Sequence, residues 1–101
     1  MYRYDLTRQG DCLRLSFEAE EMGREAARTM PLAERSDVIH ARAHQICEQA
    51  LAESGQLTND PAAYTTSFVD AYTDAYFREL VALFHKNLHS TVRRQPETRP
   101  S

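Results

Sequence analysis

Apolar and polar residues alternate near the start of the chain. Two short runs show this period of two, and between them lies the segment RQGD, whose Gly10 suits a tight turn. Alternation places every second side chain on one face of a strand. We therefore expect a β-hairpin over residues 2–17, with one apolar face that a helix must cover. The apolar residues of the two runs are Tyr2, Tyr4 and Leu6, and then Leu13, Leu15 and Phe17.

After residue 17 the apolar residues recur at intervals of three and four, as in amphipathic helices. The spacing predicts one helix over about residues 18–30, which Pro31 would end, and a second over about residues 32–54. Gly55 is expected as a left-handed cap of the second helix. Ser36-Asp37 is an alternative start that the pattern leaves open. The two stripes are Ala19, Met22, Ala26 and Met30, and then Leu32, Ile39, Ala43, Ile46 and Ala50.

The segment Asn59-Asp60-Pro61 is the strongest local signal in the chain. Asp60 is a good N-cap because its carboxylate can accept unpaired backbone amides, and Pro61 suits the first helical position. We expect a third helix over about residues 61–90 and a disordered tail at 93–101, where charged residues and proline dominate. The predicted fold is thus α+β, a single small domain over residues 1–92 in which the N-terminal hairpin packs on two or three helices.

The apolar face of the third predicted helix turns along its length. Ala71 and Ala75 form a small-residue ridge on the first face, which favours close packing, either against the second helix or, less favoured, against another chain. A small core can use the first face, so the second could cover the predicted hairpin or meet another chain. The predicted partner interface comprises Phe77, Val81, Phe84, Leu88, Tyr72 and Tyr76. Asp74 and Arg78 are spaced for an i,i+4 ion pair.

All four histidines occur as pairs spaced four residues apart, at His40 and His44 and at His85 and His89. Cys47 follows the first pair on the same helical arc. Two helices presenting such ligands could complete a tetrahedral zinc site. The more favoured interpretation is that these are ordinary surface and boundary side chains, because isolated helical histidine pairs are common without any metal.

Composition narrows the classes of function. The net charge of −3 argues against the broad basic surface that nucleic-acid binding needs. A DNA-binding dimer would therefore have to gather its arginines on one side. We expect neither a secretory signal nor a membrane span, a cytoplasmic location, and free thiols at Cys12 and Cys47. The arginines that such a dimer would gather are Arg24, Arg28, Arg35, Arg42, Arg93 and Arg94.

No arrangement of residues predicts catalysis. Ala41 and Lys86 stand where a metalloprotease helix carries glutamate, and the three glycines form no phosphate-binding loop. We therefore expect a small interaction or regulatory protein that self-associates as a homodimer or binds a protein partner. Its small size and lack of motifs fit a bacterial phage, plasmid or other mobile element. The alternatives are a metal-binding protein for zinc, nickel or cobalt, and a dimeric DNA-binding regulator.

Overall fold

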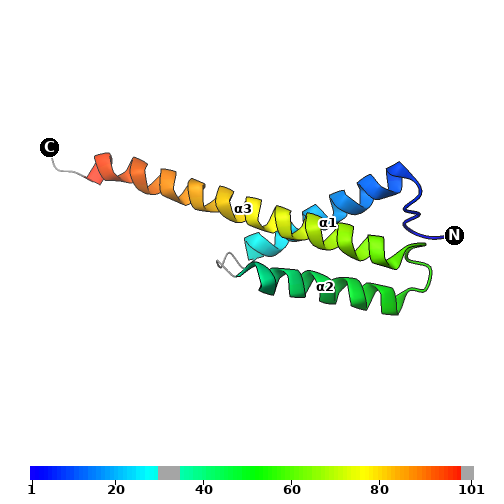
Figure 1. The fold of residues 1–101 in the computed structure, drawn as a ribbon. Helices are drawn as coiled ribbons and strands as arrows, with labels where there is room; N and C mark the ends of the chain where they lie inside the picture. Colours follow the sequence, from blue (N-terminus) through cyan, green and yellow to red (C-terminus); the bar gives the residue numbers. More distant parts are fainter. Residues whose placement is uncertain (30–34, 99–101) are drawn as a thin grey trace.

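The chain folds into three helices, α1 (Gln9–Thr29), α2 (Ser36–Glu53) and α3 (Pro61–Thr98), in the computed structural model shown in Figure 1. The structure describes residues 1–29 and 35–98, and the side chains of residues 1–29 and 35–86. Both α1 and α2 pack on α3, and they do not pack on each other. The central element is therefore the first half of α3.

The predicted α+β fold is wrong, because residues 1–29 and 35–98 contain no strand or sheet. Residues 9–17 of the predicted hairpin form the first half of α1 instead. The alternation that suggested a strand is misleading, since Leu13 and Phe17 are 63% and 60% exposed while Leu15 is buried. Leu15 belongs to a helical face with a period of four, whose other members are Ala19, Gly23 and Ala27. Three of these four residues are alanine or glycine, which differ little from polar residues in hydrophobicity, so the helical period is hard to detect in the sequence.

The small residues of α1 let its backbone approach α3 closely. A Cβ atom on Gly23 would overlap the carbonyl oxygen of Tyr72 and lie 3.2 Å from the amide nitrogen of Tyr76. Ala19 and Ala27, on either side of Gly23, are fully buried. Small side chains at such a crossing permit a short interaxial distance, so the position of α1 is set mainly by backbone contact with α3.

The first apolar run of the predicted hairpin lies in residues 1–8, which we call the strap. These residues form neither a helix nor a strand, and they include a turn closed by the bond from the Arg8 amide to the Asp5 carbonyl oxygen. The Tyr4 amide donates to the carbonyl oxygen of Leu57 at 2.9 Å, and Tyr4 and Thr58 form a single parallel bridge. Within the described residues this is the only β-type pairing. The Leu6 amide donates to Oδ1 of Asn59 at 2.9 Å, which ties the strap to the loop between α2 and α3. Tyr4 is buried as predicted for a core residue, but in a different element.

The start of α2 at Ser36 agrees with the alternative that the sequence left open. Residues 30–34, which include Pro31 and Leu32, lie outside the described residues. The predicted left-handed cap at Gly55 is wrong, because no described glycine has a positive φ. Instead, α2 ends at Glu53, and the following cap residue Ser54 has extended backbone, φ −135° and ψ 112°, with its amide donating to the carbonyl oxygen of Ala50.

The predicted N-cap of α3 is confirmed. The Ala63 amide donates to Oδ1 of Asp60 at 3.1 Å, and the Tyr64 amide donates to the Asp60 carbonyl oxygen at 2.9 Å. Pro61 occupies the first helical position, and α3 continues without a break to Thr98, beyond the expected end near residue 90.

Aromatic rings form a row through the core. The ring centroids of Tyr4 and Tyr64 are 5.7 Å apart, those of Tyr64 and Phe68 6.0 Å, and those of Phe68 and Tyr72 5.9 Å. From α2, the fully buried side chains of Ile39 and Cys47 join this cluster. The core therefore lies along the first half of α3, between the strap at one end and the crossing of α1 at the other.

Beyond that core, α3 leaves the other two helices. The molecule is correspondingly elongated, with extents of 69 × 26 × 17 Å. Figure 1 shows the second half of α3, in orange and red, projecting past the ends of α1 and α2. We call residues 81–98 the α3 extension.

Candidate interaction surface

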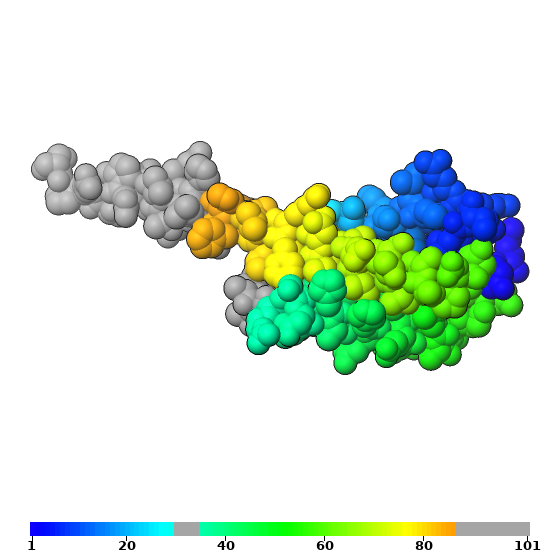
Figure 2. All heavy atoms as spheres, in the orientation of Figure 1, coloured from blue at the N-terminus to red at the C-terminus, as the bar shows by residue number. Residues whose placement is uncertain are grey.

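The α3 extension begins with two exposed apolar side chains. Val81 is 56% and Phe84 67% exposed, and both lie where α3 leaves the three-helix body. Phe77 and Leu80, one turn earlier, are partly buried and pack against the core. In Figure 2 this stretch, drawn in yellow and orange, narrows away from the body. Among the described residues, nothing covers Val81 and Phe84 in the way that α1 and α2 cover the first half of α3.

The predicted partner interface is thus divided by the structure. Tyr72 and Tyr76 are buried inside the chain, and the Tyr76 ring packs edge-on against Phe77 with centroids 5.2 Å apart. These two tyrosines belong to the core and are not available to a partner. Leu88 lies outside the residues whose side chains the structure describes.

Of the two alanines in the small-residue ridge predicted on α3, the second, Ala75, is buried inside the molecule. It lines a recess together with Glu20 and Arg24 of α1. Next to it, Nε of Arg78 lies 3.0 Å from Oδ2 of Asp74, which confirms the predicted i,i+4 ion pair. Close helix packing at this site therefore involves α1.

The first histidine pair does not share an environment with Cys47. His44 is exposed and His40 half-buried, whereas Cys47 is fully buried in the core. Burial, together with the nearby Glu48 carboxylate, raises the pKa of the Cys47 thiol to about 11. A cysteine binds a metal ion as the deprotonated thiolate. The buried Cys47 thiol, with its raised pKa, is therefore poorly suited to share a metal ion with His44 at the surface.

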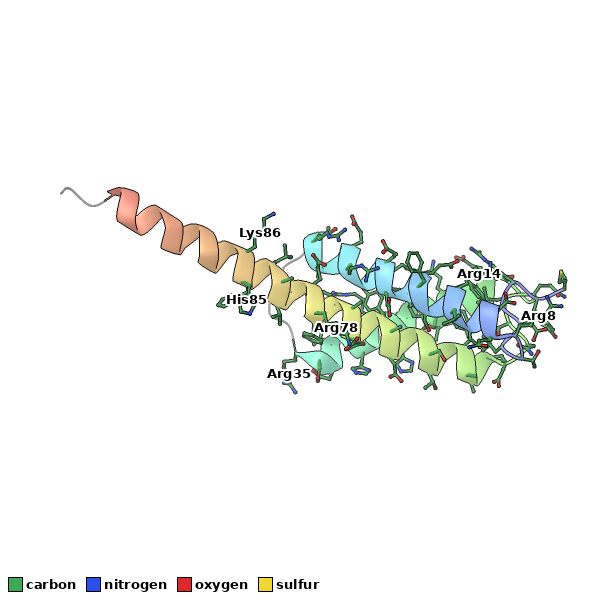
Figure 3. All side chains as sticks on the ribbon, turned by 90° about the horizontal axis from the view of Figure 1, so that it is seen from above. Arg8, Arg14, Arg35, Arg78, His85 and Lys86 are labelled. Carbon is green, nitrogen blue, oxygen red and sulfur yellow. The ribbon has the colours of Figure 1, made fainter. Side chains whose placement is uncertain are left out.

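The second histidine pair lies on the α3 extension. His85 is exposed, and its ring meets the Phe84 ring edge-on with centroids 6.4 Å apart. His85 and Lys86 point away from the helix on different sides in Figure 3. His89 lies outside the described side chains. Within residues 1–29 and 35–86, no group of three or more histidine, cysteine, aspartate or glutamate side chains is placed to hold a metal ion.

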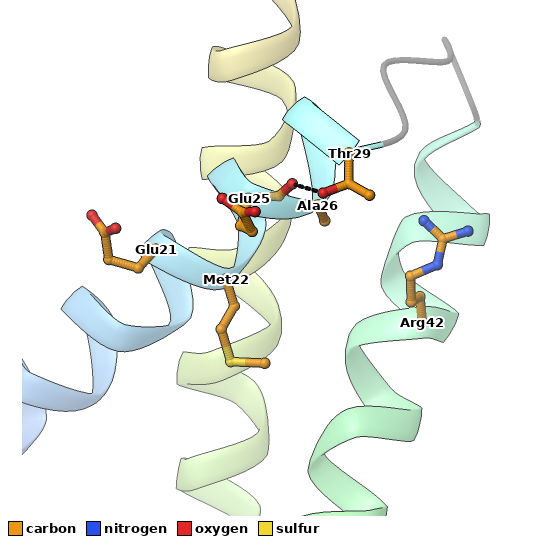
Figure 4. A pocket seen from close by; sticks show the side chains of 6 residues that line it. All are labelled: Glu21, Met22, Glu25, Ala26, Thr29 and Arg42. Atoms are coloured by element: carbon orange, nitrogen blue, oxygen red, sulfur yellow. Dashed lines mark hydrogen bonds between the residues drawn. The ribbon is translucent and has the colours of Figure 1, made fainter.

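An open hollow of about 610 Å³ lies between α1 and α2 (Figure 4). Met22 and Ala26 supply its apolar surface, while Glu21, Glu25 and Arg42 supply charged groups. Over the part of the chain that the structure describes, its walls include no histidine, cysteine or serine. The hollow exists because α1 and α2 straddle α3 without packing on each other. Among the described residues that line it, the one hydroxyl is that of Thr29, and it donates to the backbone carbonyl oxygen of Glu25 at 2.9 Å rather than to a side chain that could act as a base.

A second pair of exposed apolar side chains, which the sequence interpretation missed as a surface, lies on α1. Leu13 and Phe17 are one helical turn apart and exposed to a similar degree as Val81 and Phe84. The signal was available, since residues four apart share a helix face, but it depends on recognising α1 as a helix from Gln9. Unlike Val81 and Phe84, this pair belongs to a helix that packs on the first half of α3 along its length (Figure 1).

Comparison with known proteins adds no relative. No protein-family model, curated protein or solved structure matches this chain. Among the described helices, none is long and apolar enough to cross a membrane. Function is therefore inferred from the surface of the molecule.

Proposed function

We propose that this protein is a small non-enzymatic interaction protein that self-associates through the apolar face of the α3 extension. The observation that carries the proposal is the exposure of Val81 and Phe84, 56% and 67%, on a stretch of helix that projects beyond the body. Burying one such side chain fully contributes roughly 1.5–3 kcal/mol. A second helix laid on this face would gain that contribution from each chain.

The spacing of the apolar residues supports a helical partner. Phe77, Val81, Phe84 and Leu88 follow one another at intervals of four, three and four residues. This alternation is typical of the line along which two helices pack in a coiled coil. The line starts at the edge of the core with Phe77 and continues onto the α3 extension, so a partner helix would extend the existing core without rearranging it.

Support for a non-enzymatic role comes from the remaining surface. Among the described residues, the hollow between α1 and α2 offers two carboxylates, one guanidinium and the hydroxyl of Thr29 around apolar side chains, and this hydroxyl is hydrogen-bonded to a backbone carbonyl oxygen rather than to a base. Cys47 is enclosed and has a raised pKa. Neither feature supplies an activated group at an accessible place.

The proposal is tested by replacing Val81 and Phe84 together with serine. The wild-type protein should sediment as a dimer at high micromolar concentration, and the double variant as a monomer, because serine removes the apolar area that the contact buries. Both side chains are exposed, so the circular dichroism and melting temperature of the monomer should change little.

The matched control replaces Leu13 and Phe17 with serine, since these side chains are exposed to a similar degree on α1. This control should remain a dimer. A wild-type protein that sediments as a monomer at high micromolar concentration would contradict the proposal, as would a Val81→Ser, Phe84→Ser variant that still dimerises.

A further inference from the structure

Tyr4 is the one buried side chain among the first four residues of the strap. It is 3% exposed, whereas Met1 is 103% and Tyr2 45% exposed, and Arg3 is exposed as well. The burial of apolar area that holds residues 1–4 on the molecule is therefore concentrated in a single ring.

Residues 1–4 connect two parts of the fold. On one side, the Arg3 amide donates to the carbonyl oxygen of Gln56 and the Tyr4 amide to that of Leu57, each at 2.9 Å. Both acceptors belong to the loop between α2 and α3. The backbone of residues 1–4 is thus bound to that loop by two hydrogen bonds.

On the other side, residues 1–4 contact α1 through polar side chains. The Tyr4 hydroxyl donates to the carboxylate of Glu18, and the Arg14 guanidinium donates to the Arg3 carbonyl oxygen. Cζ of Arg14 also lies 4.6 Å from the centroid of the Tyr4 ring. The ring of Tyr4 is therefore held from above by one helix and from the side by the loop.

Residues 5–8 are anchored by hydrogen bonds that do not involve residues 1–4. The Asp5 amide donates to Oδ2 of Asp11 at 2.9 Å, and Nδ2 of Asn59 donates to Oδ1 of Asp5 at 3.0 Å. These bonds can persist when residues 1–4 move away. A hinge between Tyr4 and Asp5 is the consequence.

A hollow of about 200 Å³ lies beneath residues 1–4, and Arg3 and Tyr4 form one of its walls. The Tyr4 ring lies 5.7 Å from that of Tyr64, centroid to centroid, at the end of the aromatic row. Withdrawal of Tyr4 enlarges the hollow and exposes this end of the row to solvent. The remaining large apolar side chains of the wall come from all three helices and the loop before α3: Leu15, Met22, Ile46, Leu57, Tyr64 and Phe68.

We propose that residues 1–4 are a lid, hinged between Tyr4 and Asp5, that opens while α1, α2 and α3 stay folded and exposes this apolar hollow. Segments held by few apolar contacts open locally at a lower free energy than global unfolding requires. The lid lies at the end of the molecule opposite the α3 extension (Figure 1), so its opening is independent of the proposed self-association.

Hydrogen exchange in the full-length wild-type protein, followed by NMR, tests the lid. The Arg3 and Tyr4 amides should be protected about ten-fold less or weaker still than those of Tyr72 and Tyr76, which lie in the core of α3. Their protection should also depend little on low urea concentrations, because lid opening exposes little surface. The Asp5 amide, in the anchored turn, should be better protected than that of Tyr4.

Two results of this measurement would overturn the lid. If the Arg3 and Tyr4 amides share the protection and the urea dependence of Tyr72, residues 1–4 open only when the whole protein unfolds. If they exchange as fast as in an unstructured peptide, residues 1–4 do not close over the hollow.

A pair of full-length variants tests the hollow. Tyr4→Ala should lower the protection of the Arg3 amide by a further factor of about ten, whereas Tyr2→Ala, at an exposed ring, should leave it unchanged. p-Cresol, which has the structure of the tyrosine side chain, should then raise the melting temperature of Tyr4→Ala by filling the opened hollow. It should have a much smaller effect on Tyr2→Ala.

Absence of a rise with p-cresol in folded Tyr4→Ala means that the hollow is not exposed, and an equal rise in Tyr2→Ala means that p-cresol binds elsewhere. Either result overturns the exposure of the hollow. If Tyr4→Ala does not fold, the exchange measurement on the wild-type protein decides by itself whether the lid opens.

Discussion

Gly23 is the residue at which side-chain size matters most. Its missing Cβ lets α1 lie directly on the backbone of α3 at Tyr72 and Tyr76. Glycine inside a helix ordinarily costs about 1 kcal/mol relative to alanine, so the close approach must offset that cost. At Gly10, also within α1, an added Cβ atom would have no neighbour within 4 Å, so no close contact requires glycine there.

Replacing Gly23 with alanine should therefore destabilise the protein although alanine is the better helix former. The added methyl group forces α1 away from α3. Overpacking of this kind typically lowers the free energy of unfolding by roughly 1–3 kcal/mol. Urea denaturation measures the free energy of unfolding. The matched control, Gly10→Ala, should be neutral or slightly stabilising. Equal effects of the two substitutions would contradict the close contact.

Local interactions at the residue scale were predictable, and distant ones were not. The cap at Asp60 and the ion pair between Asp74 and Arg78 involve residues within four positions of each other, so spacing alone indicates them. Glycine is required at position 23 because the backbone of Tyr72, in another helix, lies too close for a Cβ atom. Nothing near Gly23 in the sequence signals that contact.

At the scale of elements, the start of α3 depends on one side chain. Asp60 accepts the amide of Ala63, and its carboxylate lies at the positive end of a long helix dipole. The loop before it is held by the Asp60 amide, which donates to Oγ1 of Thr58 at 3.2 Å. The cap thus joins the bridge at Tyr4 and Thr58 to the start of the central helix.

Replacing Asp60 with alanine should lower the free energy of unfolding by about 1 kcal/mol, since a capping acceptor is lost while the Pro61 start is kept. Asp60→Ser is the control, because serine retains a capping oxygen and should restore most of the stability. Thermal or urea unfolding followed by circular dichroism distinguishes the two. A serine variant as unstable as the alanine variant would show that capping is not the cause.

The type of the first element was predicted wrongly for a physical reason. Periods of two and of four compete over residues 9–17, and the large residues Leu13, Leu15 and Phe17 favour the period of two. The helical period is carried by Leu15, Ala19, Gly23 and Ala27, most of which bury little area each. Tertiary packing on α3 decides the outcome, and a single sequence does not display it. The start of α3, in contrast, was predictable from its cap, whereas its end at Thr98 lies beyond the predicted end near residue 90.

At the scale of the whole molecule, several buried groups favour their neutral forms. Burial is the largest cause of the raised pKa of Tyr4, about 12, and of the Cys47 thiol, about 11. The hydroxyl of Tyr4 also donates a hydrogen bond to Glu18, which holds the proton on the tyrosine. The pKa values of Tyr64 and Tyr72 are raised by burial as well.

These groups predict a loss of stability at alkaline pH. A raised pKa in the folded state contributes stability that is present below the unfolded pKa, 9.0 for the thiol and 10.0 for tyrosine, and is lost as pH rises through the folded value. Urea midpoints should therefore be constant near pH 8 and fall progressively above about pH 9.

Tyr4→Phe should be less stable at pH 8 by about 1 kcal/mol, because the hydrogen bond to Glu18 is lost. It should also lose stability less steeply above about pH 10, since one titrating group has been removed. Tyr2→Phe changes an exposed ring and is the matched control. An equally steep alkaline loss in Tyr4→Phe and in the wild type would contradict the role given to Tyr4.

The candidate interface was only partly predictable. A small core can cover only part of a long helix, so the apolar residues beyond that part were predicted to be exposed. Val81 and Phe84 are indeed exposed. Tyr72 and Tyr76 were included because they flank the ridge of Ala71 and Ala75, for which contact with another chain was the less favoured alternative, yet they complete the core beneath α1. Local spacing does not indicate where α1 packs, so it could not tell which aromatic residues α1 would cover.

Because α1 packs on α3, the order in which the helices fold is constrained. The loop between α2 and α3 is short, so these two helices can form a hairpin early, whereas α1 docks on residues about 50 positions further along the chain. During synthesis, the alanine and glycine face of α1 has no surface to bind until α3 has left the ribosome. Docking of α1 should therefore be the late, rate-limiting step of refolding.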